Sequence, residues 1–331
     1  MIIMKNLNIY IKRVTYSLVF LFFALNIFAQ QENHFTQFMY NKLLLNPAFA
    51  SAREVASISG IYRNQWLGFN GAPKAMLLSF DAPFFNNRVG FGMNLVSEQK
   101  GITKKYYASL AYSYSIVRTE DIAFRIGLQG VLRNYNLDFT GSDQFYIDNP
   151  FLDPSIQYNS KISQIRGNVG VGVYFDYKEF FFGASVPNLY KNVIGINKTT
   201  NTEIAEEFQH FYLMSGFLLP LSEKIFLKPS GILKFVKNAP IDFDLNLSLF
   251  FNNRFSIGGS YRDGDSVDFT TFMQVTKNLG IGAAYDFTTS ELSKYNNGSI
   301  EVLLRYDFGS GASKSKFGKD IQNLSNPRFF F

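Results

Sequence analysis

The stretch Tyr106-Tyr107-Ala108-Ser109-Leu110-Ala111-Tyr112-Ser113-Tyr114-Ser115-Ile116 alternates large apolar residues with small or polar ones. Successive side chains of a β-strand point to opposite faces, so this stretch would form one apolar, aromatic face and one small, polar face. The apolar face would carry Tyr106, Ala108, Leu110, Tyr112, Tyr114 and Ile116, and the other Tyr107, Ser109, Ala111, Ser113 and Ser115. Such a strand is typical of a barrel wall between lipid and a polar lumen.

The same period of two recurs along the chain, mostly over the nine to eleven residues that a tilted membrane strand needs. The predicted strands are 55–64, 73–82, 88–97, 104–116, 122–135, 166–176, 179–187, 211–220, 224–235, 241–251, 254–263, 266–276, 279–288 and 298–308. Pro229 interrupts one of them, because proline cannot donate to a strand ladder, and predicts a bulge or a misplaced boundary there.

The connections between these segments are short and long in turn. Every connection after an even-numbered strand is tight, whereas those after odd-numbered strands include the long loops 136–165, 188–210 and 289–297. Outer-membrane barrels have short periplasmic turns, long extracellular loops and an even number of strands. A soluble β-sandwich also alternates, but the Gly, Ser and charged residues of the polar faces favour a lumen. The sequence therefore predicts an all-β, antiparallel barrel of about 14 strands with both chain ends in the periplasm.

Composition and the N-terminus agree with an exported barrel. Aromatic residues make up 17% of the chain, as two interfacial girdles require. The absence of cysteine excludes disulfides and thiol chemistry. Lys5, Lys12 and Arg13 precede an apolar run that ends before Ala29, which predicts a signal peptide over 1–29 and an outer-membrane location. A membrane anchor is the alternative, but the run is shorter than the ~20 residues of a span. The remaining bases are scattered, so nucleic acid is not an expected partner.

Two segments lie outside the strand pattern. Residues 30–54 would form a periplasmic pre-barrel segment, too apolar for a solvated tail, that packs against the barrel mouth, its lumen or a partner. Residues 309–331 would form a periplasmic tail, beginning with a Gly/Ser/Lys-rich linker and ending in three phenylalanines. The predicted organisation is thus 1–29 signal peptide, 30–54 pre-barrel segment, 55–308 barrel and 309–331 tail.

The sequence offers little for catalysis or cofactor binding. His34 and His210 are the two histidines, and the predicted topology separates them to opposite ends of the barrel. No metal-ligand spacing, phosphate loop or serine nucleophile motif is present. Residues 263–268 have a weak likeness to a calcium loop, but a hairpin turn explains the Asp-Gly pair better. We predict a non-enzymatic protein without cofactor or metal. The aromatic residues of loop 136–165 belong either to a surface loop or to a docking surface.

Two motifs and the C-terminus resemble one protein family. The stretch 37–51, Gln-Phe-Met-Tyr-Asn-Lys-Leu-Leu-Leu-Asn-Pro-Ala-Phe-Ala-Ser, is similar to a signature of the PorP/SprF family of Bacteroidota. Residues 62–73, with Arg63, Gln65 and Trp66, resemble a second family stretch, and 326–330 resemble the family's ending. Lys42 stands where the family usually has proline, and Ser51 where it has glycine.

The resemblance implies an outer-membrane accessory of type IX secretion and gliding. It implies partners among adhesin-like cargo with a C-terminal signal domain, or among periplasmic subunits of the secretion machine, besides outer-membrane lipid. In that reading Tyr40, Asn41, Asn46 and Pro47 order the pre-barrel segment, and Arg63, Gln65 and Trp66 order the first extracellular turn. The alternatives are a porin-like or hydrophobic-solute channel, which bilayer conductance would reveal, and an outer-membrane hydrolase.

Overall fold

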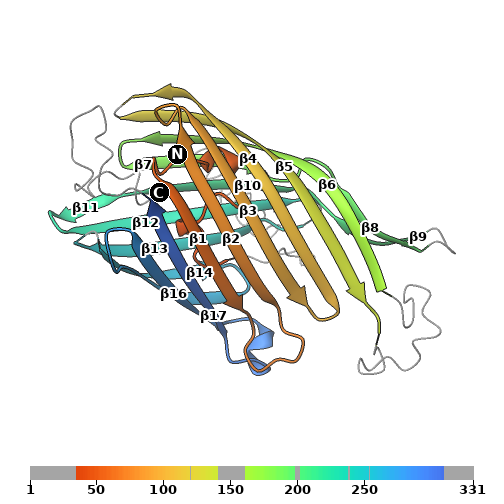
Figure 1. The fold of residues 1–331 in the computed structure, drawn as a ribbon. Helices are drawn as coiled ribbons and strands as arrows, with labels where there is room; N and C mark the ends of the chain where they lie inside the picture. The colour runs from red at the N-terminus through yellow and green to blue at the C-terminus, as the bar shows by residue number, and fades with distance from the viewer. Residues whose placement is uncertain are drawn as a thin grey trace, which may run out of the picture.

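The chain forms a closed antiparallel barrel of 14 strands, as the alternation predicts (Figure 1). The computed structural model describes residues 35–119, 121–140, 161–197, 202–237, 239–252 and 254–308. The barrel strands are β1 (Ala56–Asn64), β2 (Lys74–Phe84), β3 (Val89–Lys100), β4 (Thr103–Arg118), β5 (Ile122–Asp138), β6 (Lys161–Tyr177), β7 (Phe180–Val186), β10 (His210–Phe217), β12 (Ile225–Val236), β13 (Asp242–Phe251), β14 (Phe255–Arg262), β15 (Ser266–Gln274), β16 (Leu279–Thr288) and β17 (Ser299–Phe308).

Two strand pairings complete the ring of the barrel. The first strand, β1, pairs with the last, β17, and β10 pairs with both β7 and β12. A short strand, β11 (Leu219–Ser222), continues β10 and also pairs with β12. Closure matters because hydrocarbon offers no partner for a free backbone N–H or C=O, so a sheet that crosses lipid needs its strand groups paired.

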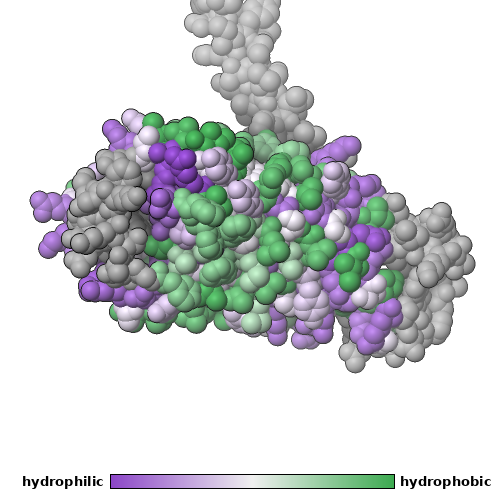
Figure 2. Space-filling model, turned by 45° about the horizontal axis from the view of Figure 1, so that its top comes forward, coloured by the Kyte–Doolittle hydropathy of each residue, from purple (hydrophilic) through white to green (hydrophobic). Residues whose placement is uncertain are grey.

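The two faces of the wall differ as the period of two requires. In β17 the apolar residues Ile300, Val302 and Leu304 are exposed on the outside, whereas Glu301 and Arg305 are buried on the lumen side. Figure 2 shows one outer face, where hydrophobic residues cover the middle and hydrophilic residues gather toward both ends. That distribution fits a wall that faces lipid over its central band. No helix among the described residues has the length and apolarity to span a membrane.

The connections at one end of the barrel are all tight, whereas those at the other end include the long ones, as predicted. The short-turn end carries the tight β2–β3, β4–β5 and β6–β7 turns. The long-loop end carries the β1–β2, β5–β6 and β7–β10 connections, and the β16–β17 connection with its 3-10 helix η4 (Glu291–Lys294). At the long-loop end β5 and β6 run several residues beyond the predicted strands, so the connection between them is shorter than 136–165. The aromatic residues of 141–160 lie outside the described residues.

Two local predictions were wrong. The predicted loop 188–210 contains two further strands, β8 (Asn192–Asn197) and β9 (Thr202–Glu207), which form a separate two-stranded sheet. Pro229 does not break its strand, because β12 runs through it in regular register with β13. The irregularity lies in the neighbouring strand, where β10 ends at Phe217 and β11 begins at Leu219 in the same register against β12, which shifts only between Pro220 and Ser222. Pro229 therefore lies opposite the gap between β10 and β11, where no strand partner requires a backbone N–H from β12.

Strand β7 is much shorter than its neighbour β6. β6 pairs with β5 along its whole length but with β7 only from Val171 to Tyr177. Beyond Val186 the chain turns toward the lumen, where the Gln129 amide donates to the carbonyl of Pro187 at 2.9 Å. The segment that follows β7 covers this edge of β6: the N–H of Leu189 donates to the carbonyl of Val169 at 2.8 Å, and the Asn168 amide donates to the carbonyl of Tyr190 at 2.7 Å.

Candidate functional site: the lumenal plug

Residues 35–53, which precede the first strand, fill the lumen (Figure 1); we call this segment the plug. All its residues are buried except Leu44 and Leu45, which are partly exposed. Its apolar side chains form one core with lumen-facing residues of the wall, among them Tyr174, Phe181 and Phe272. Of the three positions that the sequence leaves open for this segment, the structure places residues 35–53 in the lumen.

The plug is built from two short turns rather than from a long helix. These are η1 (Phe38–Tyr40) and η2 (Pro47–Phe49). Asn46 caps η2, since its side-chain oxygen accepts the N–H of Ala48 at 2.9 Å, and Pro47 occupies the first helical position. The Asn46 amide also donates to the carbonyl of Val173 in β6 at 2.9 Å. Asn46 thus both folds the turn and fastens it to the wall.

Glycines on the inner wall let η2 approach closely. A Cβ on Gly127 of β5 would overlap the backbone of Ala48, and one on Gly172 of β6 would overlap the side chain of Asn46. Glycine in a strand costs conformational entropy, but here it lets another segment approach the wall. The inner faces of β5 and β6 are therefore shaped to receive the plug.

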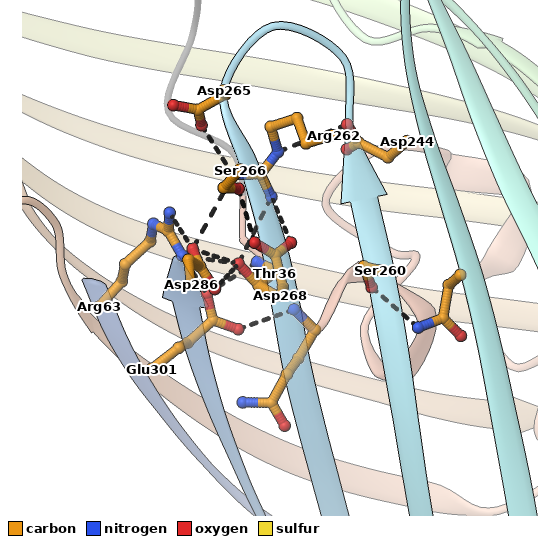
Figure 3. Close-up of polar contacts among 12 residues, drawn as sticks. Thr36, Arg63, Asp244, Ser260, Arg262, Asp265, Ser266, Asp268, Asp286 and Glu301 are labelled. Atoms are coloured by element: carbon orange, nitrogen blue, oxygen red, sulfur yellow. Dashed lines mark hydrogen bonds and ion pairs between the residues drawn. The ribbon is translucent and has the colours of Figure 1, made fainter. Parts of the chain in front are cut away.

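Carboxylates at the long-loop end hold the first residues of the plug. Glu301 accepts the backbone N–H groups of Thr36 and Gln37, each at 2.8 Å, and the Thr36 hydroxyl donates to Asp286 at 2.8 Å. Arg63 pairs with Asp286 at 2.6 Å and with Glu301 at 3.3 Å, and donates to the Thr36 hydroxyl at 2.7 Å. Figure 3 shows these side chains converging from β1, β16 and β17 on the plug.

A second arginine extends the same cluster. Arg262 of β14 lies 3.4 Å from Asp244 and 3.2 Å from Asp265, and 4.0 Å from both Asp268 and Asp286 (Figure 3). Buried charges are tolerated when they are paired and hydrogen-bonded, and removing one member of such a set leaves an unpaired charge in the interior. The cluster therefore joins the start of the plug to six strands of the wall, β1 and β13 to β17.

The short-turn end holds the last residues of the plug. Arg53 pairs with Asp307 of β17 at 2.8 Å, and the N–H of Ser51 donates to Asp81 of β2 at 3.3 Å. The hydroxyl of Ser113 in β4 donates to the carbonyl of Ala50 at 2.7 Å. The plug thus runs the length of the lumen, from the long-loop end to the short-turn end, and is fastened at both.

Tyr40 and Asn41 fasten the middle of the plug. The Tyr40 hydroxyl lies 2.7 Å from that of Ser256, and its ring stacks on Phe272 with centroids 4.7 Å apart. The Asn41 amide donates to the hydroxyl of Ser79 at 2.8 Å. Tyr40, Asn41, Asn46 and Pro47 therefore lie together in the lumen.

Lys42, which stands where the family signature usually has proline, is also buried in the middle of the plug. Its ammonium donates to the carbonyl of Met39 at 3.2 Å. It also lies over the rings of Phe49 and Phe181, 5.1 and 4.6 Å from their centroids. These cation–π contacts compensate part of the cost of taking the charge out of water.

The structure separates the other three predicted residues. Arg63 belongs to β1 and points into the lumen, where it forms part of the carboxylate cluster. Gln65 and Trp66 lie in the β1–β2 connection; the Gln65 N–H donates to the carbonyl of Pro73 at 2.9 Å. Trp66 has φ 51° and its N–H donates to Ser299 at 3.1 Å, which ties this connection to β17. That these seven residues form one functional site stays a prediction.

The described residues offer no evident catalytic or metal centre. His210 is buried at the start of β10, next to the carbonyl of Phe208, and His34 lies outside the described residues. In the described part of the chain, no three His, Asp or Glu side chains are placed to hold a metal ion. Polar groups of the lumen bond the plug to the wall, as Glu301 does with Gln37, and also bond neighbouring strands of the wall, as Asn246 does with Ser260.

Comparison with protein families agrees with the signature within the plug. The family model described as "Type IX secretion system membrane protein PorP/SprF" matches residues 27–306. The chain belongs to the PorP/SprF family. It is thus an outer-membrane β-barrel of the type IX secretion system, and this family is not a family of enzymes. The match covers the plug together with nearly the whole barrel.

Solved structures share the barrel with this PorP/SprF member at low sequence identity. The toluene transporter TodX of Pseudomonas putida is 12% identical, with a TM-score of 0.49, over 81% of this chain and 93% of that one. A FadL homologue of Pseudomonas aeruginosa is 12% identical, with a TM-score of 0.46, over 82% and 94%. BamA of Haemophilus ducreyi, lacking three of its domains, is 10% identical, with a TM-score of 0.39, over 77% and 70%. No curated protein matches the chain.

Several residues that hold the plug were missed by sequence reasoning. They are Thr36, Arg53, Asp81, Asp286 and Asp307. The one signal for the carboxylates was their position on polar strand faces near strand ends. That signal does not say which of many charged lumen positions contacts residues 35–53, because these contacts join distant parts of the chain.

Proposed function

We propose that this protein is a non-enzymatic outer-membrane accessory that supports secretion or surface anchoring of a large, adhesin-like cargo of type IX secretion. In this proposal the long-loop end faces the cell exterior and the short-turn end faces the periplasm, as in other outer-membrane barrels. In a second form of this accessory role, the protein links the outer membrane to the periplasmic ring of the secretion machine. Membership of the PorP/SprF family supports a part in type IX secretion. The filled lumen supports an accessory role in it rather than that of a channel.

The observation that carries the proposal is the way the plug occupies the lumen. A solute channel needs a continuous path, whereas residues 35–53 are almost entirely buried and are bonded to the wall at both ends and in the middle. The lumen cavities that border Leu44 and Leu45 measure about 60 and 20 Å³, too small for a drug-sized solute site. A scaffold that presents surfaces to partners fits this interior better than a pore does.

The direct test is the surface proteome and secretome of a strain lacking this chain. Loss of one large surface protein, restored by a plasmid-borne copy, would mark a dedicated cargo partner. Loss of all proteins with the type IX signal domain would mark a core part of the machine. An unchanged surface proteome, in a strain that also lacks any paralogue, would contradict the accessory role and favour the channel.

A further inference from the structure

The plug crosses the lumen in one direction, with its earlier residues at the long-loop end. Three wall residues hold Thr36, and each lies next to a long-loop connection. Arg63 is the next-to-last residue of β1, Asp286 lies just before the end of β16, and Glu301 lies just after the start of β17. The last residues of the plug are bonded at the short-turn end, where β1 begins. The chain therefore enters the plug from the side of the long loops.

The position of Thr36 is fixed by several contacts rather than by one. Its backbone N–H donates to Glu301 at 2.8 Å, and its hydroxyl accepts from Arg63 at 2.7 Å and from Arg262 at 3.4 Å. Arg262 also pairs with Asp265 in the β14–β15 turn, so Thr36 is bonded to the group that holds this turn (Figure 3). Phe35, just before Thr36, is 5% exposed. The start of the plug is thus firmly held at this end of the barrel.

From this point the chain that precedes Phe35 has three possible routes: sideways through the wall, back along the lumen, or out past the long loops. The sideways route would have to pass between strands that are paired. β17 pairs with β1 on one side and with β16 on the other, up to the residues that hold Thr36. Opening these pairs would leave backbone groups without partners in lipid, at a cost of several kcal/mol for each group.

The route back along the lumen is already occupied by the plug. The cavity that borders Phe35 measures about 20 Å³, which holds about one water molecule and no second segment of chain. Farther along, the Tyr40 hydroxyl lies 2.7 Å from that of Ser256, and the Asn41 amide donates to Ser79 at 2.8 Å. A segment that returned to the short-turn end would have to break these contacts. The way out past the long loops remains.

We infer that the chain before Phe35 leaves the barrel at the long-loop end, so that the amino terminus of the exported protein lies on the cell surface. The sequence predicts a periplasmic position for this segment, and the place of Thr36 points to the opposite side. The inference rests on the orientation of the barrel in the proposed function. With cleavage after Ala29, residues 30–34 would form the exposed end, a polar peptide of Gln, Gln, Glu, Asn and His that is open to modification, proteolysis or binding from outside.

Because the chain contains no cysteine, single introduced thiols can test this topology. Asn33→Cys reports on the chain just before the plug. Tyr295→Cys marks the long-loop end, where Tyr295 is exposed after η4, and Glu179→Cys marks the exposed β6–β7 turn at the short-turn end. Each variant is treated with a membrane-impermeant maleimide, on intact cells and on cells with a permeabilised outer membrane. On intact cells we expect Asn33→Cys to label as strongly as Tyr295→Cys and several-fold more than Glu179→Cys.

Labelling of Asn33→Cys only in permeabilised cells, as for Glu179→Cys, overturns the inference. Labelling of Tyr295→Cys only in permeabilised cells overturns the orientation of the barrel, and the inference with it. An epitope inserted between Gln31 and Glu32 gives a second measurement that does not depend on the reactivity of one thiol. Its antibody should bind to intact cells, and binding confined to permeabilised cells overturns the inference. The proposed function is tested separately by the deletion strain, which measures cargo rather than the position of the amino terminus.

Discussion

At the scale of single residues, a few buried polar groups decide where the plug lies. Glu301 is the clearest case, since one carboxylate accepts two consecutive backbone N–H groups and pairs with Arg63. The plug has little regular secondary structure, so its backbone groups need partners from the wall. Residues such as Glu301 supply those partners, and their effect on stability should exceed that of any exposed ion pair.

The change Glu301→Gln tests this. It keeps the size of the side chain but removes the charge that Arg63 and two N–H groups share, so we expect a loss of about 1–3 kcal/mol in stability. The measurement is the temperature at which the heat-modifiable barrel band disappears on electrophoresis. The matched control is Glu291→Gln, whose carboxylate pairs with Lys294 on the exposed η4. Equal midpoints for the two variants would contradict a special role for Glu301.

At the scale of elements, the inner wall and the plug are complementary in shape. η2 packs against β4, β5 and β6, and glycines in β5 and β6 make room for it. The turn is itself ordered by its Asn46 cap and by Pro47. The fit therefore depends on small wall residues on one side and on a preformed turn on the other.

The wall side of this fit is tested by Gly127→Ala, with Gly130→Ala as its control. A Cβ at Gly127 would overlap the backbone of Ala48, whereas a Cβ at Gly130 of the same strand meets nothing within 4 Å. We expect only Gly127→Ala to displace the plug. An added Ala48→Cys substitution reports this, because the introduced thiol should react with maleimide in the Gly127→Ala protein and stay protected in the control. Protection in both would show that the wall yields instead of the plug.

The plug side is tested by the double change Asn46→Ala, Pro47→Ala. It removes the cap of η2, the bond from Asn46 to Val173 and the proline that favours the turn. A lost cap costs about 1 kcal/mol, which the 14-stranded wall should tolerate. We therefore expect normal amounts of heat-modifiable barrel in the outer membrane but several-fold less cargo at the cell surface. Normal cargo display in this variant would argue against a role of the ordered plug in secretion.

At the scale of the whole molecule, the ring and the plug have separable tasks. The wall is closed by β1–β17 and β10–β12 pairing without any contribution from residues 35–53. The lumen, by contrast, is filled by that segment. Wall and lumen should thus respond differently when the plug is removed.

Deletion of residues 35–53 should leave a barrel that conducts ions. In planar bilayers we expect discrete conductance steps from the deletion variant and none of comparable size from the full chain. The heat-modifiable band must persist in the variant, which shows that the wall has assembled. Large, stable conductance from the full chain would instead favour the porin-like alternative.

The sequence by itself determined the wall of this protein. Alternation and turn length are local properties, so the strand number, the lipid-facing residues and the two kinds of barrel end follow from short stretches such as 106–116. The family signature in 37–51 was equally local. Errors arose opposite the gap between β10 and β11, where Pro229 stays in a regular strand, and beyond Val186, where β7 ends.

Only the tertiary structure decided what fills the lumen and what Arg63 does. Thr36 and Glu301 are 265 positions apart, and no local pattern pairs them. Closing the ring brings the first and last strands together and encloses the segment before them. Its apolar and polar groups then find partners on the inner wall, whereas Leu44 and Leu45 stay partly exposed. The physical reason is that side-chain partners inside a barrel are set by closure, which no single stretch of sequence encodes.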